Sequence, residues 1–94
     1  MSNGETITIE VWRPDILILF NGVKPKIIVD GKEVGKIKHG ESIFFETTPG
    51  EHEVEVKALT THNYKGTFDL QKGTIVKVGT DLVGLYLETT TEKK

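Results

Sequence analysis

The chain has 94 residues, with 12 basic and 14 acidic side chains and no cysteine. This length predicts one domain with a single core, and the lack of cysteine excludes disulfides and thiolate metal sites. A net charge of −2 gives no electrostatic attraction to nucleic acid or to an anionic membrane, and the longest apolar run, residues 16–20, is far shorter than the ~20 residues that span a bilayer.

The N-terminus, MSNGET, is polar and lacks the charged and then apolar pattern of a signal peptide. We therefore expect the chain as given to be cytoplasmic and not to insert into a membrane. If it is a piece of a longer protein, an upstream signal or anchor would place it outside the cytoplasm.

The first predicted strand covers residues 6–13 and alternates strictly between apolar and other side chains. Such alternation of β-branched residues is typical of a half-buried strand. One face would carry Ile7, Ile9 and Val11, and the other Thr8, Glu10 and Trp12. Pro14 interrupts this strand, and residues 16–20 predict a second strand that is apolar on both faces.

The Asp-Gly pair at residues 30–31 predicts a type I′ hairpin turn, in which both central residues need positive φ. A two-residue turn would pair Ile27 with Val34 and would leave Ile37 on the outer face. We expect a β-bulge at Gly35 to return Ile37 to the inner face.

The remaining strands follow at regular intervals. A strand at residues 42–47 is followed by a type II turn at Pro49-Gly50. Residues 51–58 then alternate most cleanly, with His52, Val54, Val56 and Ala58 facing inward. Further strands are predicted at 64–70 (Tyr64, Phe68 and Leu70 inward), 74–80 and 81–88, with flexible polar tails at 1–5 and 89–94.

No stretch of about ten residues shows the 3.6-residue period of a helix. The fold class predicted is all-β, a single-domain antiparallel β-sandwich of seven or eight short strands. In an up-and-down arrangement, the lysines at 24–38 and the glutamates at 41–55 would lie on neighbouring strands, so we expect cross-strand ion pairs between them.

Side chains that carry chemistry are scattered along the chain. The spacing of His39, His52 and His62 matches no short metal-ligand motif, and His52 is expected to be a structural histidine. Ser42 has no glycine elbow around it, and no glycine turn feeds the helix that a phosphate loop needs. We therefore predict no catalytic residue, no metal site, no cofactor and no enzymatic activity.

Residues 16–20 and 82–87 are apolar on both faces, although a sandwich strand buries only one face. Two explanations stay open. Either connecting segments or a curled sheet cover the second face, or that face binds a protein partner or a second copy of the chain. The candidate interaction face consists of Trp12, Leu17, Leu19, Leu82 and Tyr86.

Two stretches, residues 29–35 and 48–56, resemble PEGA-like small β-sandwich domains and related families of unknown function. The matching positions are Asp30, Gly31, Val34, Gly35, Pro49, Gly50, His52, Val54 and Val56, and Trp12-Arg13-Pro14 is similar to an aromatic-Arg-Pro found in some relatives. The chain has NGVKP at residues 21–25, where the P-x-G-A motif of PEGA domains would stand. The resemblance implies a non-catalytic accessory domain, often part of surface or envelope proteins.

The sequence thus predicts a non-enzymatic interaction or accessory domain that acts through its sheet edges or an apolar sheet face. The alternative is a small-ligand or carbohydrate-binding module that stacks its ligand on Trp12, Tyr64 or Tyr86.

Overall fold

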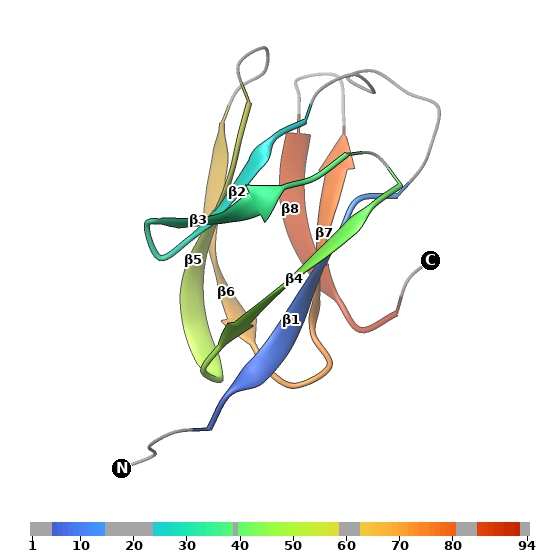
Figure 1. The fold of residues 1–94 in the computed structure, drawn as a ribbon. Coiled ribbons are helices and arrows are strands. Elements are labelled where there is room, and N and C mark those ends of the chain that lie inside the picture. Colours follow the sequence, from blue (N-terminus) through green and yellow to red (C-terminus); the bar gives the residue numbers. More distant parts are fainter. Residues whose placement is uncertain (1–4, 15–23, 39, 59–62, 81–84, 93–94) are drawn as a thin grey trace.

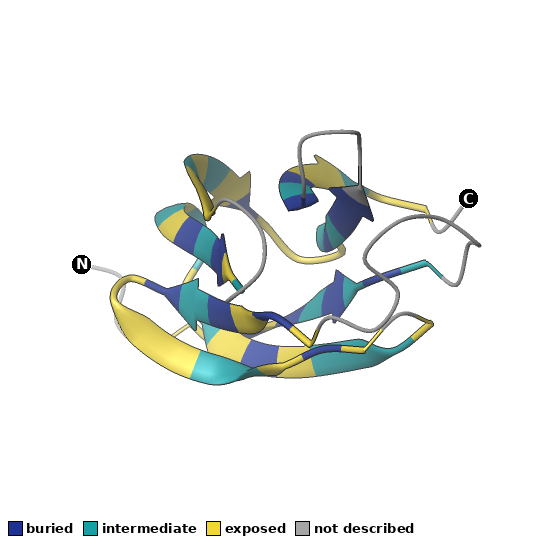
Figure 2. Ribbon diagram, turned by 90° about the horizontal axis from the view of Figure 1, so that it is seen from above, coloured by how far each residue is buried: buried dark blue, intermediate teal, exposed yellow. Residues whose placement is uncertain are grey.

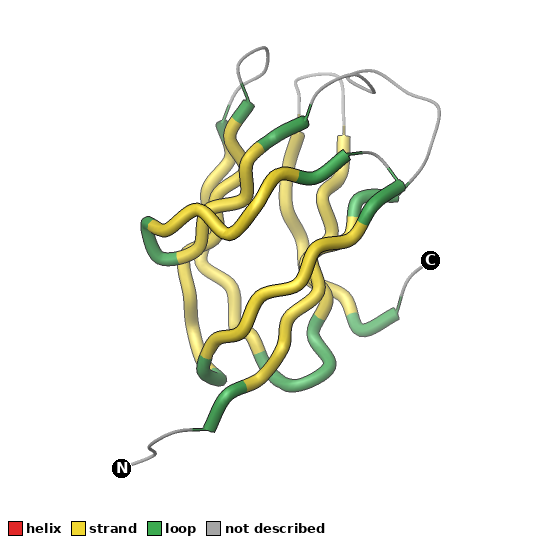
Figure 3. Tube along the Cα trace, viewed as in Figure 1, coloured by secondary structure: helices red, strands yellow, loops and turns green. Residues whose placement is uncertain are grey.

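The computed structural model describes residues 5–14, 24–38, 40–58, 63–80 and 85–92, which form eight strands and no helix (Figure 1, Figure 3). The strands are β1 (Ile7–Trp12), β2 (Lys26–Val29), β3 (Lys32–Lys36), β4 (Ser42–Thr47), β5 (Gly50–Lys57), β6 (Tyr64–Leu70), β7 (Ile75–Thr80) and β8 (Leu85–Thr90). Within these ranges no helix has the length and apolarity that crossing a membrane requires.

The strands form two four-stranded sheets that pack face to face. Sheet A has the order β4-β1-β7-β8, and sheet B has the order β3-β2-β5-β6. Buried positions alternate with exposed ones along the strands (Figure 2), as period-two patterning requires. The buried core contains Ile7, Ile9, Val11, Ile27, Val29, Ile37, Phe45, Val54, Val56, Leu70, Val76, Val78, Leu85 and Leu87. Each fully buried side chain of this kind contributes about 1.5–3 kcal/mol. The predicted all-β fold is confirmed.

Sheet A is mixed, which corrects the prediction of a purely antiparallel sandwich. Strand β1 pairs with β4 antiparallel but with β7 parallel, so that Trp12 lies beside Lys77. Turn signals in a sequence identify hairpins between consecutive strands, whereas β1 and β7 are far apart in the chain and share no turn. The turn at Pro49-Gly50 likewise joins strands of different sheets, so β4 and β5 are not neighbours.

The expected ion pairs between the lysines at 24–38 and the glutamates at 41–55 are wrong, although β2 and β5 are neighbouring strands. None of the ion pairs between described residues joins one set to the other. Strand β2 instead lies between β3 and β5, and its Lys26 is paired in register with Lys36 on one side and Lys57 on the other.

The β2–β3 hairpin has the predicted turn and bulge. Asp30 and Gly31 have φ of 51° and 84°, both positive as a type I′ turn requires. The register shifts after the turn, so that Ile27 pairs with Gly35 and Val34 is the extra residue. Ile37 is fully buried as a result.

Some of the sequence predictions differ from the structure or lie outside the described residues. Strand β8 continues to Thr90, two residues into the expected tail 89–94. Tyr64 has the predicted inward phase, since it is paired with the buried Val56, but the residue is 39% exposed. The doubly apolar segment 16–20 and residues 82–84 lie outside the described residues.

Candidate functional site

The outward-facing side chains of sheet A form one surface, which we call the sheet A outer face. The strand registers place these residues side by side in rows that cross the sheet. The face consists of Ser42, Phe44 and Glu46 from β4, Thr8, Glu10 and Trp12 from β1, Ile75, Lys77 and Gly79 from β7, and Tyr86, Glu88 and Thr90 from β8.

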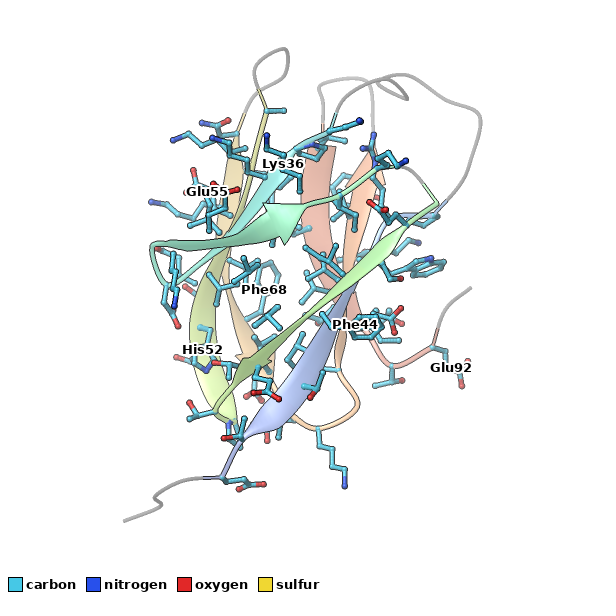
Figure 4. All side chains as sticks on the ribbon, in the orientation of Figure 1. Lys36, Phe44, His52, Glu55, Phe68 and Glu92 are labelled. Carbon is cyan, nitrogen blue, oxygen red and sulfur yellow. The ribbon has the colours of Figure 1, made fainter. Side chains whose placement is uncertain are left out.

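Phe44 is the most exposed large apolar side chain of this face, at 62%. It lies opposite Glu10, which in turn lies beside the partly buried Ile75. Figure 4 shows Phe44 beside β4 and β1, while Phe68 lies between the two sheets, where it packs against the core. A single exposed ring is ordinary on a protein surface, so the informative feature is that Phe44 shares its face with other apolar side chains.

Tyr86 lies across the neighbouring strand. It is paired with Gly79, and a Cβ added to Gly79 would lie only 2.2 Å from the Tyr86 Cζ atom. The phenol ring therefore occupies the space that a side chain on β7 would need. Trp12 from β1 and Tyr86 from β8 flank β7, so this part of the face carries two partly buried rings.

Charged groups lie among the rings of the face. The Lys77 Nζ atom is 5.8 Å from the centroid of the Trp12 ring and 3.6 Å from Glu88 Oε2. The first contact has the geometry of a cation–π interaction. Ser42 Oγ donates a hydrogen bond of 2.6 Å to Glu10 Oε2. The face thus combines apolar rings with fixed charges of both signs.

Of the residues predicted for the interaction face, the structure brings Trp12 and Tyr86 together on the same surface. Leu17, Leu19 and Leu82 lie outside the described residues. Tyr64, proposed from the sequence as a third stacking residue, belongs to β6 in sheet B and does not join the other two rings.

Phe44 and Ile75 were missed by the sequence reasoning. A signal for Phe44 exists, because Ile43, Phe44 and Phe45 are three consecutive apolar residues in one strand, and alternation sends the middle one to the opposite side from its neighbours. Phe45 is buried and Phe44 is exposed.

His52 forms a separate polar cluster at one end of sheet B. Its Nδ1 lies 2.6 Å from Asp30 Oδ2 and its Nε2 lies 2.7 Å from the carbonyl oxygen of Thr48. Both partners accept hydrogen bonds, so both ring nitrogens donate when the imidazole is protonated. The hydrogen bond to Asp30 is the main cause that raises the pKa of His52, and the same bond lowers the pKa of Asp30.

The other oxygen of Asp30 accepts a hydrogen bond of 3.0 Å from the Glu53 amide. The cluster therefore ties the β2–β3 turn to the start of β5 and to the β4–β5 turn. This is the structural role that the sequence predicts for His52.

Arg13 is a buried cation at the end of β1, only 3% exposed. Its Nη1 donates a hydrogen bond of 3.2 Å to the Ile37 carbonyl oxygen, and its backbone pairs with Glu41 and Gly40. Burial lowers the pKa of its guanidinium. Arg13 thereby holds the segment between β3 and β4 against the end of β1.

The described part of the chain contains no group of three or more His, Cys, Asp or Glu side chains that could bind a metal ion. Comparison of the chain with protein-family models, with curated proteins and with solved structures finds no match. The resemblance to PEGA-like domains therefore stays a prediction.

Proposed function

We propose that this chain is a non-enzymatic interaction domain that binds a protein partner through the sheet A outer face, and that this partner is a second copy of the chain. The observation that carries the proposal is the exposure of Phe44, 62% of which is open to water on a face that also holds Trp12 and Tyr86. Burying such a side chain in an interface contributes about 1.5–3 kcal/mol to the free energy of association. The PEGA-like resemblance of residues 29–35 and 48–56 favours an accessory role of this kind.

The edges of sheet B are less suited to binding a partner strand than the face of sheet A is to binding a partner. The edge strands of sheet B are β3 and β6. Strand β3 contains the bulge and the charged residues Lys32, Glu33 and Lys36, and β6 carries Lys65 and Asp69. Charges and bulges on an edge strand oppose edge-to-edge pairing. The face of sheet A is therefore the better candidate for the contact.

A second copy of the chain suits this face because the face carries complementary features. Phe44 forms part of the lining of a shallow hollow whose other lining residues are Thr8, Glu10, Gly73, Thr74 and Ile75. Acidic and basic groups lie near each other on the same surface, with Glu88 next to Lys77. In a two-fold contact the same patch meets itself, so a ring can fill the hollow of the other copy and acids can face lysines.

Sedimentation over a range of concentrations tests the proposal, with the natural chain compared to Phe44→Ser and to the matched variant Ile28→Ser. Ile28 is a partly buried apolar residue on the outer side of sheet B. We expect the natural chain to self-associate, and Phe44→Ser to weaken association about tenfold or more, as for a central aromatic residue of an interface. Ile28→Ser should leave association unchanged. A chain that stays monomeric, or equal loss in both variants, contradicts the proposal.

A carbohydrate-binding role is the second candidate. It is favoured by the two rings of Trp12 and Tyr86 on one face, with Glu10 and Glu88 near them as hydrogen-bond acceptors. A panel of saccharides in a thermal-shift experiment distinguishes it from self-association. A saccharide that raises the melting temperature of the natural chain but not of Trp12→Ala supports this role, and no shift from any saccharide rejects it.

A further inference from the structure

Three lysines lie in a row across the outer side of sheet B, on three adjacent strands. Lys26 of β2 is paired in register with Lys36 of β3 and with Lys57 of β5. All three are exposed, and Figure 4 labels Lys36 near one end of the sheet. Residues directly opposite each other have Cβ atoms about 4.5–5.5 Å apart, and like charges in such positions destabilise a sheet. We call these residues the lysine row.

An acidic side chain near the lysine row offsets part of its positive charge. Glu33 lies 3.9 Å from the Nζ atom of Lys26, a long contact between two side chains that are about half exposed. Elsewhere on the same sheet, Lys65 makes an acidic contact of the same kind, with Glu53 of the neighbouring strand at 3.9 Å. The lysine row therefore combines closely spaced positive charges with one weak acidic contact to its central member.

The lysine row lines a hollow at this end of sheet B. Lys24 belongs to the same lining, so four lysines and one glutamate, Glu33, give the hollow a charge of +3. Its lining also includes the apolar side chain of Ile28 and the amide of Asn63. The volume is about 470 Å³, which suits a small molecule.

We propose that the lysine row binds a small ligand that carries a phosphate group, of the phosphate-ester or polyphosphate class. A phosphate presents two negative charges and three oxygens at one point, so it can accept hydrogen bonds from ammonium groups that reach it from several strands. Its charge offsets the mutual repulsion of the lysines. A single carboxylate has one charge and matches this arrangement less well. Ile28 and Asn63 then lie beside the remainder of the ligand.

Isothermal titration of the natural chain with inorganic pyrophosphate at low ionic strength tests the proposal. We expect saturable binding, and Lys26→Gln or Lys57→Gln should each weaken it about tenfold, the effect of losing a charge-assisted hydrogen bond. The matched control is Lys72→Gln, which makes the same change of net charge at an exposed position in the β6–β7 turn. It should change the affinity less than about twofold, because it acts through net charge alone.

Three results would overturn the proposal. The first is the absence of saturable binding, and the second is an equal loss of affinity in Lys72→Gln, which would mean that only net charge matters. The third is that citrate, titrated at the same ionic strength, binds as tightly as pyrophosphate, which would remove the assignment to phosphate. The test does not depend on sheet A, so its failure leaves the proposed interaction face untouched.

Discussion

The two sheets have the same inner pattern and different outer faces. On the inner side both sheets alternate buried aliphatic residues, such as Ile9 in β1 and Val54 in β5. On the outer side, sheet A presents the rings of Phe44 and Tyr86, whereas sheet B presents charges that include the lysine row. Packing therefore fixes one side of each strand and leaves the other side open to different chemistry.

The fold tolerates this difference because outer-face interactions are weak. Exposed ion pairs such as Lys65–Glu53 contribute about 0–1 kcal/mol, while each buried aliphatic side chain contributes about 1.5–3 kcal/mol. The contrast between the two outer faces depends, however, on the strand register of sheet B, because only that register aligns the three lysines of the lysine row.

The largest effect is expected from Gly31→Val, which tests the turn that sets this register. Gly31 has φ of 84° and no other atom within 4 Å of an added Cβ, so the penalty comes from the backbone and not from a clash. A β-branched residue there should lower the free energy of unfolding by about 1–3 kcal/mol. Thermal denaturation should show a midpoint lower by roughly 5–15 °C. Lys32→Val, at the next and exposed position, is the control and should change the midpoint little. An unchanged midpoint in Gly31→Val would show that the turn does not need positive φ.

A smaller effect on stability is expected from the Asp30–His52 pair. Measuring it shows whether this charge pair at the end of sheet B stabilises the sheet more than the interactions on its outer face do. His52 has a raised pKa, so its contribution is complete below its ordinary value of 6.5 and is lost as pH rises through the raised value. Asp30 has a lowered pKa, so its contribution is complete above its ordinary value of 3.8 and is lost as pH falls through the lowered value. The pair is therefore most stabilising between these two ordinary values. Because the Asp30 side chain is half exposed, we expect about 1 kcal/mol or less.

Urea unfolding of the natural chain and of Asp30→Asn, from about pH 5 to pH 9, measures this contribution. Asparagine tolerates positive φ as aspartate does, so the turn is kept. We expect the natural chain to lose stability on the alkaline side and the variant to lose much less. The control Asp69→Asn, on the exposed side of β6, should keep the alkaline loss. Equal pH profiles for the natural chain and Asp30→Asn would contradict the assigned role of the pair.

Much of the fold was predictable because its determinants are local. Alternation located β4 and β6 at the residues where the structure has them, and the Asp-Gly turn with the bulge near Gly35 predicted the burial of Ile37. The parallel pairing of β1 with β7 was not predictable in this way. It joins strands far apart in the chain, and no turn residue records it.

The candidate sites were less predictable than the fold because both depend on register between distant strands. Trp12 and Tyr86 lie on one face because β1 and β8 both pair with β7, which brings these two distant strands into the same sheet. The lysine row comes from three strands, and the order of residues in the chain predicts ion pairs of Lys26 and Lys36 with glutamates. The observed register instead places Lys57 and Lys36 on either side of Lys26. Composition shows the charges but not which of them are neighbours.

The smallest expected effect gives the most direct test of the comparison, because the same substitution should have opposite signs on the two faces. Lys77→Gln on sheet A removes contacts to Glu88 and to the Trp12 ring, so it should lower the free energy of unfolding by about 0.3–1 kcal/mol. Lys26→Gln on sheet B removes two like-charge neighbours and one long ion pair with Glu33. It should leave stability unchanged or raise it by about 0.2–0.5 kcal/mol when no anion is bound.

Urea unfolding at low ionic strength measures both signs, and the chain's one tryptophan makes the first substitution visible by fluorescence. Emission from Trp12 should change in folded Lys77→Gln, which loses the ammonium group near the ring, but not in Lys26→Gln. Because the Debye length falls to about 3 Å at 1 M salt, high salt should bring the two variants close together in stability. If Lys26→Gln destabilises the chain as much as Lys77→Gln, the lysines of sheet B repel one another too little to matter. The contrast between the two faces would then be one of composition and not of energy.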